Sequence, residues 1–301
     1  MSAILVTGAA GQVGHALTGL DWPEGVTLLT PDRATLDLSS PRSVAAWFVQ
    51  VEVDAIVNCA AFTGVDAAED AVGDAFAANA LGPALLADQA RRAGIPLVQI
   101  STDYVFDGSA TGFYPENAAV SPLGVYGASK LAGEHAVLRG APRAVVLRTA
   151  WVLGPHRHNF LKTMLRLAAQ RDEIRVVDDQ HGCPTAAGDI AEAVRTVVLR
   201  MMTDPAAPGG VFHFVNAGEA SWCALARAIL ERSAELGGPT AKVVPVTSAA
   251  YPTRARRPVN SRLATGRIER EYGISPRPWR EAVGEIVTEM MMGAKRGSEA
   301  A

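Results

Sequence analysis

The chain opens with a short apolar run that leads directly into a glycine-rich loop. Residues 3–6 are apolar, residues 8–14 read GAAGQVG, and alanine and leucine follow at the start of an expected helix. Glycines let a backbone turn tightly and approach a pyrophosphate, and the N-terminus of the next helix offers free N–H groups and a partial positive charge. Strand, loop and helix in this order favour a dinucleotide site that includes Gly8, Gly11 and Gly14. The alternative is a tight turn that binds nothing.

The rest of the first half alternates short apolar strands with helices. Further strands are expected at residues 26–29, 53–58, 96–100 and 144–147. This alternation is typical of an α/β fold with a Rossmann-like doubly wound parallel sheet.

Beyond residue 150 the rhythm changes. A helix at 188–202 and a strand at 211–215 are expected to return to the sheet. We therefore predict a Rossmann domain, formed by residues 1–150 plus about 187–214, and a smaller C-terminal α/β substrate domain, formed by about 151–186 and 215–301.

One long helix is expected between residues 66 and 92, where Ala and Leu recur at helical spacing. The pair Gly82-Pro83 predicts a bend in it. Asn79 lies inside this helix and is either a solvated residue or a polar anchor; the pattern favours neither.

Composition and charge exclude several classes of protein. The 301 residues are 49% hydrophobic and carry a formal net charge of -3, so no overall field attracts nucleic acid. No apolar run approaches the roughly 20 residues that a membrane span requires. Cys59, Cys183 and Cys223 form no CxxC pair and the histidines form no HxxxH pair, so we expect neither disulfides nor a metal site. The N-terminus enters a folded motif at once, which leaves no room for a signal peptide and predicts a cytoplasmic protein.

Two charged residues follow the second expected strand, where the adenosine ribose of a dinucleotide would lie. Asp32 suits the 2′-hydroxyl of NAD, whereas Arg33 suits the 2′-phosphate of NADP. Both are present, and Arg33 tilts the expectation slightly toward NADPH. The alternative is that either residue is a solvated turn charge.

Tyr126 and Lys130 are separated by one helical turn, so their side chains fall on the same face of the expected helix. A phenol has a pKa of about 10, and a neighbouring ammonium lowers that pKa, which makes the pair a candidate general acid or base. The YxxxK spacing alone is a weak signal. Thr102 and Asp103 follow a strand, where ligands meet a doubly wound sheet. Taken alone, they are more typical of a helix cap or turn.

A basic run near the C-terminus, residues 251–261, contains Arg254, Arg256 and Arg257. It is either a solvated surface patch or a clamp for a diphosphate, which arginine suits geometrically. The pattern leaves both interpretations open.

Together these motifs resemble the extended short-chain dehydrogenase/reductase superfamily and, nearly end to end, its dTDP-4-dehydrorhamnose reductase family. The segments that carry the resemblance are STDYVFD at 101–107, VYGASKLAGE at 125–134, RTAWV at 148–152, NFLKTMLR at 159–166, DQHGCPT at 179–185 and the run at 251–261. The resemblance implies reduction of the C4 ketone of dTDP-4-dehydro-L-rhamnose to dTDP-L-rhamnose, with NADPH or NADH as cofactor and a dTDP-sugar as the binding partner.

The resemblance also assigns roles to residues. It implies a catalytic triad in which Tyr126 donates the proton, Lys130 lowers the pKa of Tyr126 and binds the nicotinamide ribose, and Thr102 polarises the C4 oxygen. The implied cofactor contacts are Gly8, Gly11, Gln12, Val13, Gly14, Asp32, Arg33, Asp37, Leu38, Ala61, Phe62, Thr63, Tyr126 and Lys130. The implied substrate contacts are Thr102, Asp103, Trp151, Asn159, Lys162, Arg256 and Arg257.

Two departures from related sequences refine these expectations. Related dehydratases carry Asp-Glu after the threonine, whereas this chain has Asp103-Tyr104, which favours plain reduction over elimination of water. Some family members use a glutamate after the third glycine for magnesium-linked dimerisation. Here His15 follows, so we expect no such metal and a monomer or weak homodimer. The alternatives are a non-catalytic NADP-binding regulatory subunit that resembles the methionine adenosyltransferase β subunit, and a reductase of another 4-keto-6-deoxy nucleotide sugar.

Overall fold

The fold is built on a six-stranded parallel sheet with the strand order β10-β5-β4-β3-β1-β2. The structure is a computed structural model that describes residues 1–299, with side chains described through residue 293. The strands are β1 (Ser2–Thr7), β2 (Val26–Leu29), β3 (Ala55–Asn58), β4 (Leu97–Thr102), β5 (Ala144–Thr149) and β10 (Gly210–His213). The doubly wound parallel sheet is therefore confirmed. Its strand order reverses between β1 and β3, which is where open α/β sheets bind ligands.

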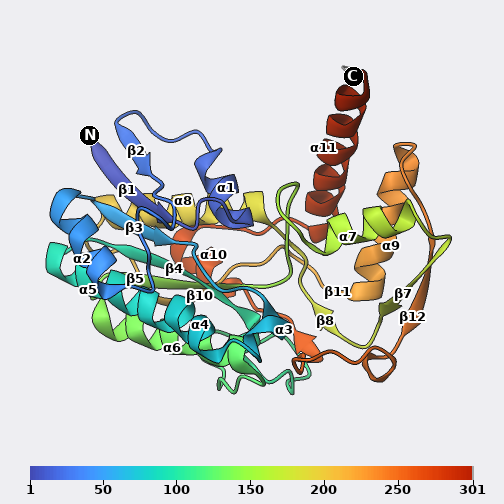
Figure 1. Ribbon diagram of the computed structural model, residues 1–301, viewed down its shortest axis with the longest axis horizontal. Helices are drawn as coiled ribbons and strands as arrows, with labels where there is room; N and C mark the ends of the chain where they lie inside the picture. Colours follow the sequence, from blue (N-terminus) through green and yellow to red (C-terminus); the bar gives the residue numbers. More distant parts are fainter. Residues whose placement is uncertain (300–301) are drawn as a thin grey trace.

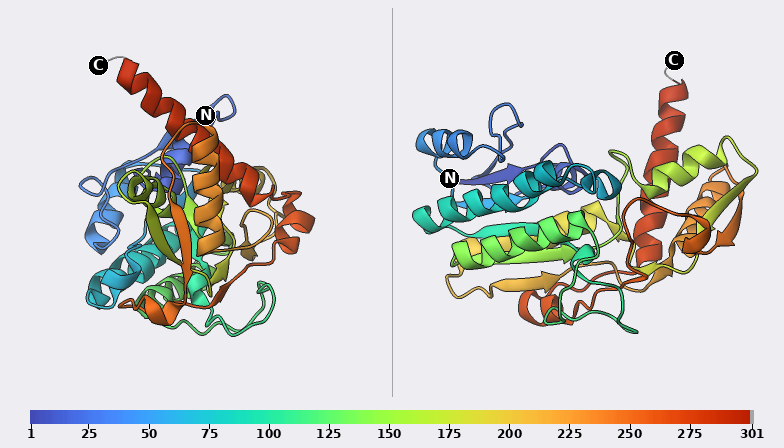
Figure 2. Two further views of the ribbon diagram at one scale, coloured as in Figure 1. Left: turned by 90° about the vertical axis from the view of Figure 1, so that its right-hand side faces the viewer. Right: turned by 60° about the horizontal axis from the view of Figure 1, so that its bottom comes forward.

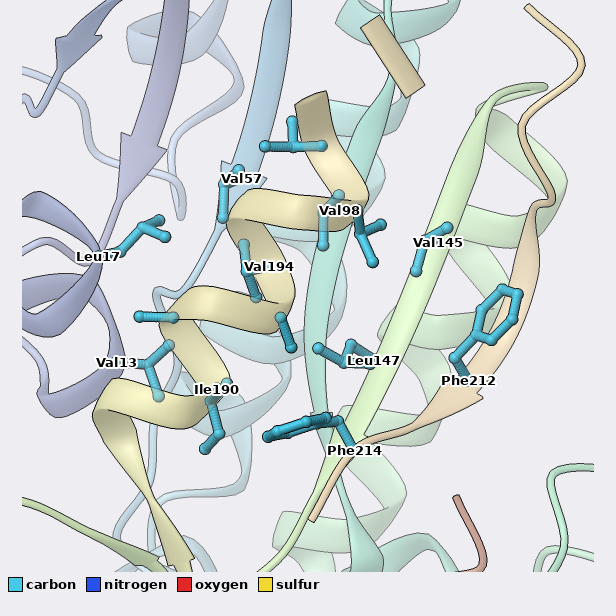
Figure 3. Packing of buried hydrophobic residues seen from close by; sticks show 14 of the residues in the cluster. Val13, Leu17, Val57, Val98, Val145, Leu147, Ile190, Val194, Phe212 and Phe214 are labelled. Atoms are coloured by element: carbon cyan, nitrogen blue, oxygen red, sulfur yellow. The ribbon is translucent and has the colours of Figure 1, made fainter. Parts of the chain in front are cut away.

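Helices cover both faces of this sheet (Figure 1, Figure 2). One face carries α1 (Gln12–Thr18), α8 (Ala187–Thr203) and α10 (Gly266–Tyr272). The other face carries α2 (Pro41–Gln50), α5 (Gly82–Ala93) and α6 (Val125–Gly140). In Figure 3, Ile190 and Val194 of α8 lie over the valines of the sheet, among them Val98 of β4. Because both faces are buried, the central strands are mostly apolar.

A second group of elements lies beside one end of the sheet (Figure 1). It comprises α7 (Phe160–Ala168), α9 (Trp222–Glu235), α11 (Trp279–Glu299) and a parallel pair of strands, β7 (Glu173–Val177) and β12 (Lys242–Val246). These elements share a separate apolar core that includes Leu161, Ile229 and Val283.

Short elements join the two groups. The strands are β6 (Val152–Leu153), β8 (His181–Gly182), β9 (Thr185–Ala186), β11 (Ala220–Ser221) and β13 (Asn260–Ser261), and the 3-10 turns are η2 (Asp103–Val105) and η3 (Ser248–Ala250). The strand β6 pairs with β9, and β8 pairs with both β11 and β13.

The prediction of one long helix between residues 66 and 92 is wrong. The segment forms α3 (Val65–Ala68), α4 (Val72–Phe76), a π-helical turn η1 (Ala77–Leu81) and then α5. The π turn contains Asn79, which is buried and acts as a polar anchor: its Oδ1 accepts from Phe62 N at 2.8 Å, and its Nδ2 donates to Ser129 Oγ at 3.0 Å. A buried amide needs such partners, and a π turn is a common way to present one at a functional site.

Candidate active site

A cavity of about 950 Å³ opens at the carboxyl ends of β1, β3, β4 and β5. It brings together most of the residues predicted from the sequence: Gly8, Gly11, Gln12, Val13, Asp32, Arg33, Asp37, Leu38, Ala61, Thr63, Thr102, Asp103, Tyr126, Lys130 and Trp151. Six other predicted residues lie outside its lining, namely Gly14, Phe62, Asn159, Lys162, Arg256 and Arg257.

The glycine loop forms one wall of the cavity from bare backbone. Gly8 has a φ of 70°, and a Cβ there would lie 2.5 Å from Ala60 N. A Cβ on Gly14 would lie 2.3 Å from Gly8 O, so Gly14 serves the packing of α1 against the loop. Gly11 is the N-cap of α1 and supplies no side chain, which leaves this wall open to a close ligand. These features suit the pyrophosphate of a dinucleotide.

The far end of the cavity holds the charges predicted to meet the ribose. Asp32 turns its carboxylate back onto its own loop, where Oδ1 accepts from Thr35 N at 2.8 Å. Hydrogen bonds from the side chain and the backbone of Thr35 lower the pKa of Asp32. The side chain of Arg33 is 84% exposed, and its Nε lies 3.7 Å from Asp37 Oδ1. Arg33 is therefore the freer of the two groups.

Tyr126 and Thr102 meet inside the cavity. Tyr126 is the second residue of α6, and its side chain and that of Thr102 both line the cavity. Burial raises the pKa of Tyr126 to about 12, and Thr102 opposes that rise. The phenol therefore keeps its proton at neutral pH, which suits a proton donor.

Lys130 lies one turn along α6 and behaves differently from the expectation. Its Nζ donates to Ile100 O at 2.7 Å, and burial lowers its pKa to about 8. The predicted lowering of the Tyr126 pKa by this ammonium is wrong for this structure, because desolvation of the phenolate dominates. Lys130 nevertheless lines the same cavity as Tyr126.

Thr102 and Asp103 combine the two roles that the sequence left open. Thr102 caps the turn η2, since its Oγ1 accepts from Tyr104 N at 3.2 Å, and it also lines the cavity. The same hydroxyl donates to Asp103 Oδ1 at 3.0 Å. Burial raises the pKa of Asp103 to about 6, and hydroxyl hydrogen bonds from Ser261 and Thr102 oppose the rise.

Trp151 forms part of the wall next to the C-terminal elements. Its φ of 46° lies in the left-handed region, and its carbonyl accepts from Thr185 N at 3.1 Å. The indole stacks on Trp222, which itself contacts Phe160. A flat apolar surface of this kind suits the face of a sugar or a base.

Three of the predicted residues outside the lining, Asn159, Lys162 and Arg257, have partners within the protein. Asn159 is the N-cap of α7, and its Nδ2 donates to Gln12 Oε1 at 2.8 Å, which ties α7 to the glycine loop. Lys162 Nζ donates to Pro155 O at 3.0 Å. Arg257 pairs with Asp66 at 2.7 Å. Arg256 is exposed to solvent.

Arg157 and His158 are among the cavity residues that were missed from the sequence. Arg157 Nε donates to Ala10 O at 2.6 Å. The available signal was their position just after β6, near the carboxyl end of the sheet. Among the described residues, no group of three or more His, Cys, Asp or Glu side chains is arranged to hold a metal ion. Within the same part of the chain, every helix is too short or too polar to cross a membrane.

Comparisons with known proteins agree over almost the whole chain. A family model described as the RmlD substrate binding domain matches residues 1–292. The chain is similar to a dTDP-4-dehydrorhamnose reductase of Sinorhizobium fredii, at 42% identity over 97% of this chain and 99% of that protein. It is also similar to the solved structure of such a reductase from Clostridium acetobutylicum, with 36% identity and a TM-score of 0.89 over 96% of this chain and 99% of that chain. A second solved structure, of the Bacillus anthracis reductase in complex with NADP, has 32% identity and a TM-score of 0.88 over 96% of this chain and 100% of that chain.

Proposed function

The chain belongs to the RmlD substrate binding domain family, and we propose that it reduces the C4 ketone of dTDP-4-dehydro-L-rhamnose to dTDP-L-rhamnose with NADPH or NADH. The observation that carries this proposal is that Tyr126 and Thr102 line one cavity with the glycine loop. A proton donor and a dinucleotide cradle in one cavity are what reduction of a ketone requires.

The cofactor would occupy the wall formed by the glycine loop and by the turn at Asp32 and Arg33. Gln12 and Val13 follow the N-cap of α1 and would face the pyrophosphate, and Ala61 and Thr63 lie farther along the same cavity. When bound, the reduced nicotinamide supplies the hydride. The pyrophosphate of the cofactor fits beside Gly11, because the N-cap of α1 carries no side chain there.

The protein's own residues would manage the proton. Tyr126 holds its proton until negative charge develops on the C4 oxygen, and then donates it. The Thr102 hydroxyl, which donates to Asp103 Oδ1 in this structure, would donate to the same oxygen instead. Lys130, anchored on Ile100 O, would place a positive charge next to the developing alkoxide and bind the nicotinamide ribose.

The nucleotide sugar would lie between Trp151 and the C-terminal elements. Asp103 and Trp151 line the cavity there. The Nη1 of Arg257 is buried and has no hydrogen-bond partner among the described residues, which leaves one donor for the diphosphate. Asn159, Lys162 and Arg256 complete the proposed set. In this view residues 1–150 plus about 187–214 bind the cofactor, and about 151–186 and 215–301 bind the sugar nucleotide.

The acid-base groups favour reduction over elimination of water. The residue after Asp103 is Tyr104, which has a phenol where elimination would need a carboxylate. Burial raises the pKa of Tyr104, so the phenol keeps its proton at neutral pH. We further propose that the protein works in the cytoplasm as a monomer or weak homodimer. Light scattering with and without magnesium tests the oligomeric state.

One reaction mixture tests the function. The protein is incubated with dTDP-4-keto-6-deoxyglucose, a 3,5-epimerase and either NADPH or NADH. We expect loss of nicotinamide absorbance that depends on the epimerase, and dTDP-L-rhamnose as product. A different product stereochemistry would assign another 4-keto-6-deoxy sugar. Cofactor binding without any oxidation, together with a stoichiometric protein partner, would favour the regulatory alternative and contradict the proposal.

A further inference from the structure

Helix α6, which carries Tyr126, begins without a capping side chain of its own. Its N-cap is Gly124, and no residue of the preceding loop supplies a side-chain cap. The amide of Val125 instead donates to Glu69 Oε1 at 2.9 Å, across 56 residues of sequence. A carboxylate that accepts from a first-turn amide satisfies one free N–H and also meets the positive end of the helix dipole.

The contact is built closely. A Cβ on Gly124 would lie 2.5 Å from Glu69 Oε1, so glycine at this position leaves room for the carboxylate. Gly124 has an extended backbone, with φ at -150° and ψ at 176°, which any residue can adopt. The glycine therefore serves the approach of Glu69 and not an unusual backbone conformation.

The start of α6 also determines where the phenol lies. Tyr126 follows Val125 directly, and its ring packs edge-on against Tyr104 with centroids 5.5 Å apart. A Cβ on Gly127 would lie 2.1 Å from Tyr104 O, so the first turn of α6 is pressed against the chain that follows Thr102. A small shift of this turn would move the phenol relative to Thr102, and proton transfer is sensitive to such shifts.

The segment that carries Glu69 is held in place at both sides. Asp66 accepts from Ala255 N at 2.9 Å and pairs with Arg257 at 2.7 Å. Asp70 pairs with Arg254. The segment 66–70 thus connects the basic run to the first turn of α6. Its contacts on both sides of Glu69 fix the position of the backbone that carries this carboxylate.

We propose that Glu69 is a positioning residue for proton transfer: by accepting from Val125 N, it holds the first turn of α6 so that Tyr126 meets Thr102 and the substrate oxygen. Glu69 does not line the cavity, so it acts through Tyr126 and not on the substrate. This inference rests on the proposed reductase function, but the hydrogen bond itself can be tested without activity.

Four variants test the proposal: Glu69→Ala, Glu69→Gln, Gly124→Ala and, as a control, Asp74→Asn. Asp74 is an exposed acidic residue of the neighbouring α4. The Glu69→Gln variant keeps an acceptor oxygen, and Gly124→Ala displaces the carboxylate while leaving Glu69 in the sequence. For each variant we would measure kcat, the KM for the nucleotide sugar, the Kd for NADPH, the solvent isotope effect on kcat and amide hydrogen exchange at residues 125–128.

We expect Glu69→Ala and Gly124→Ala to lower kcat about tenfold or more, because misplacement of a reacting group is costly. Their KM and Kd should stay within about twofold of the wild-type values, since neither residue lines the cavity. Their solvent isotope effect should rise because proton transfer becomes slower, and exchange at residues 125–128 should speed up. The Glu69→Gln variant should regain most of the lost kcat, and Asp74→Asn should match the wild type.

Other results would overturn the proposal. A kcat within about twofold of wild type for Glu69→Ala or Gly124→Ala would contradict it. A fall in kcat accompanied by a similar rise in the KM for the sugar and in the Kd for NADPH would also contradict it, because that pattern would show general damage to the fold. If Glu69→Ala fails to fold, Gly124→Ala and Glu69→Gln decide the question. If the wild-type protein turns over no nucleotide sugar, the proposed function fails, and unchanged exchange at residues 125–128 would then reject the Glu69 contact separately.

Discussion

The indole rings of Trp151 and Trp222 stack face to face, with centroids 3.5 Å apart and an angle of 7° between the planes. Trp151 belongs to the turn after β5, whereas Trp222 begins α9 of the C-terminal group. A Cβ on Gly182 would lie 2.4 Å from Trp151 Cε2, so the indole is also confined from a second strand. The left-handed backbone of Trp151 costs about 1–3 kcal/mol and persists because these neighbours hold the ring.

Removal of Trp222 should weaken binding of the nucleotide sugar. An aromatic pair contributes about 0.5–1.5 kcal/mol beyond its buried area, so we expect Trp222→Ala to raise the KM for the sugar about 2- to 10-fold. The Kd for NADPH should be unchanged, because Trp222 reaches the cavity only through Trp151, which is assigned to the sugar. Trp222→Phe keeps an aromatic ring, so its KM for the sugar should lie between those of the wild type and Trp222→Ala. Steady-state kinetics and NADPH titration check this, and an equal loss of affinity for both ligands would show that the stack does not act on the sugar side alone.

The Tyr126→Phe variant should lose turnover and keep the cofactor. Phe retains the ring that packs against Tyr104 but removes the phenolic proton. General acids contribute about 10²- to 10⁴-fold, so we expect a fall in kcat of that size, with a Kd for NADPH near the wild-type value. The measurement is single-turnover oxidation of NADPH beside a fluorescence titration. Near-normal turnover in the variant would show that another group donates the proton.

Arg33 should determine the preference for NADPH over NADH. Asp32 is engaged with Thr35, whereas the Arg33 side chain is 84% exposed and available to a 2′-phosphate. A hydrogen bond to a charged group contributes about 1.5–3 kcal/mol, so Arg33→Ala should raise the KM for NADPH by about tenfold or more and leave that for NADH unchanged. Arg42→Ala, an exposed arginine on α2, is the control. If Arg33→Ala changes both KM values alike, the selectivity lies elsewhere.

Local patterns predicted the sheet and the cofactor half of the cavity because their causes are local. The apolar run before Gly8 becomes β1, and the next residues form the loop and α1 within a few positions. Parallel strands then bring their carboxyl ends to one edge, so Thr102 and Tyr126 meet although 24 residues of sequence separate them.

What the sequence could not supply depends on distant partners. The pairing of Arg257 with Asp66 spans 191 residues, and no local pattern indicates which carboxylate an arginine will find. The π-helical turn at Asn79 depends on Phe62 and Ser129, which only the folded chain brings near. The direction of the Tyr126 pKa shift was predicted from Lys130 alone. In the folded chain, burial of the phenol is the largest cause and raises that pKa, and a sequence does not reveal how deeply a residue is buried.

Acid should destabilise the protein through His213. This residue is fully buried; its Nε2 lies 3.5 Å from Arg148 Nη1, and its Nδ1 has no hydrogen-bond partner among the described residues. Burial, and then the guanidinium of Arg148, lower the pKa of His213 from 6.5 to about 3. Both carboxylate oxygens of Glu134 accept from the same Arg148.

The sign follows from the protons bound in each state. Between pH 6.5 and about 3 the unfolded chain protonates His213 and the folded chain does not. The free energy of unfolding should therefore fall as the pH falls through this window, by up to about 1.4 kcal/mol per pH unit from this group. Urea denaturation at pH 7.5, 6.0 and 5.0 measures it. The His213→Gln variant lacks the titrating ring, so its stability should depend less steeply on pH below 6.5. Equal slopes for the two proteins would show that His213 does not titrate differently on unfolding.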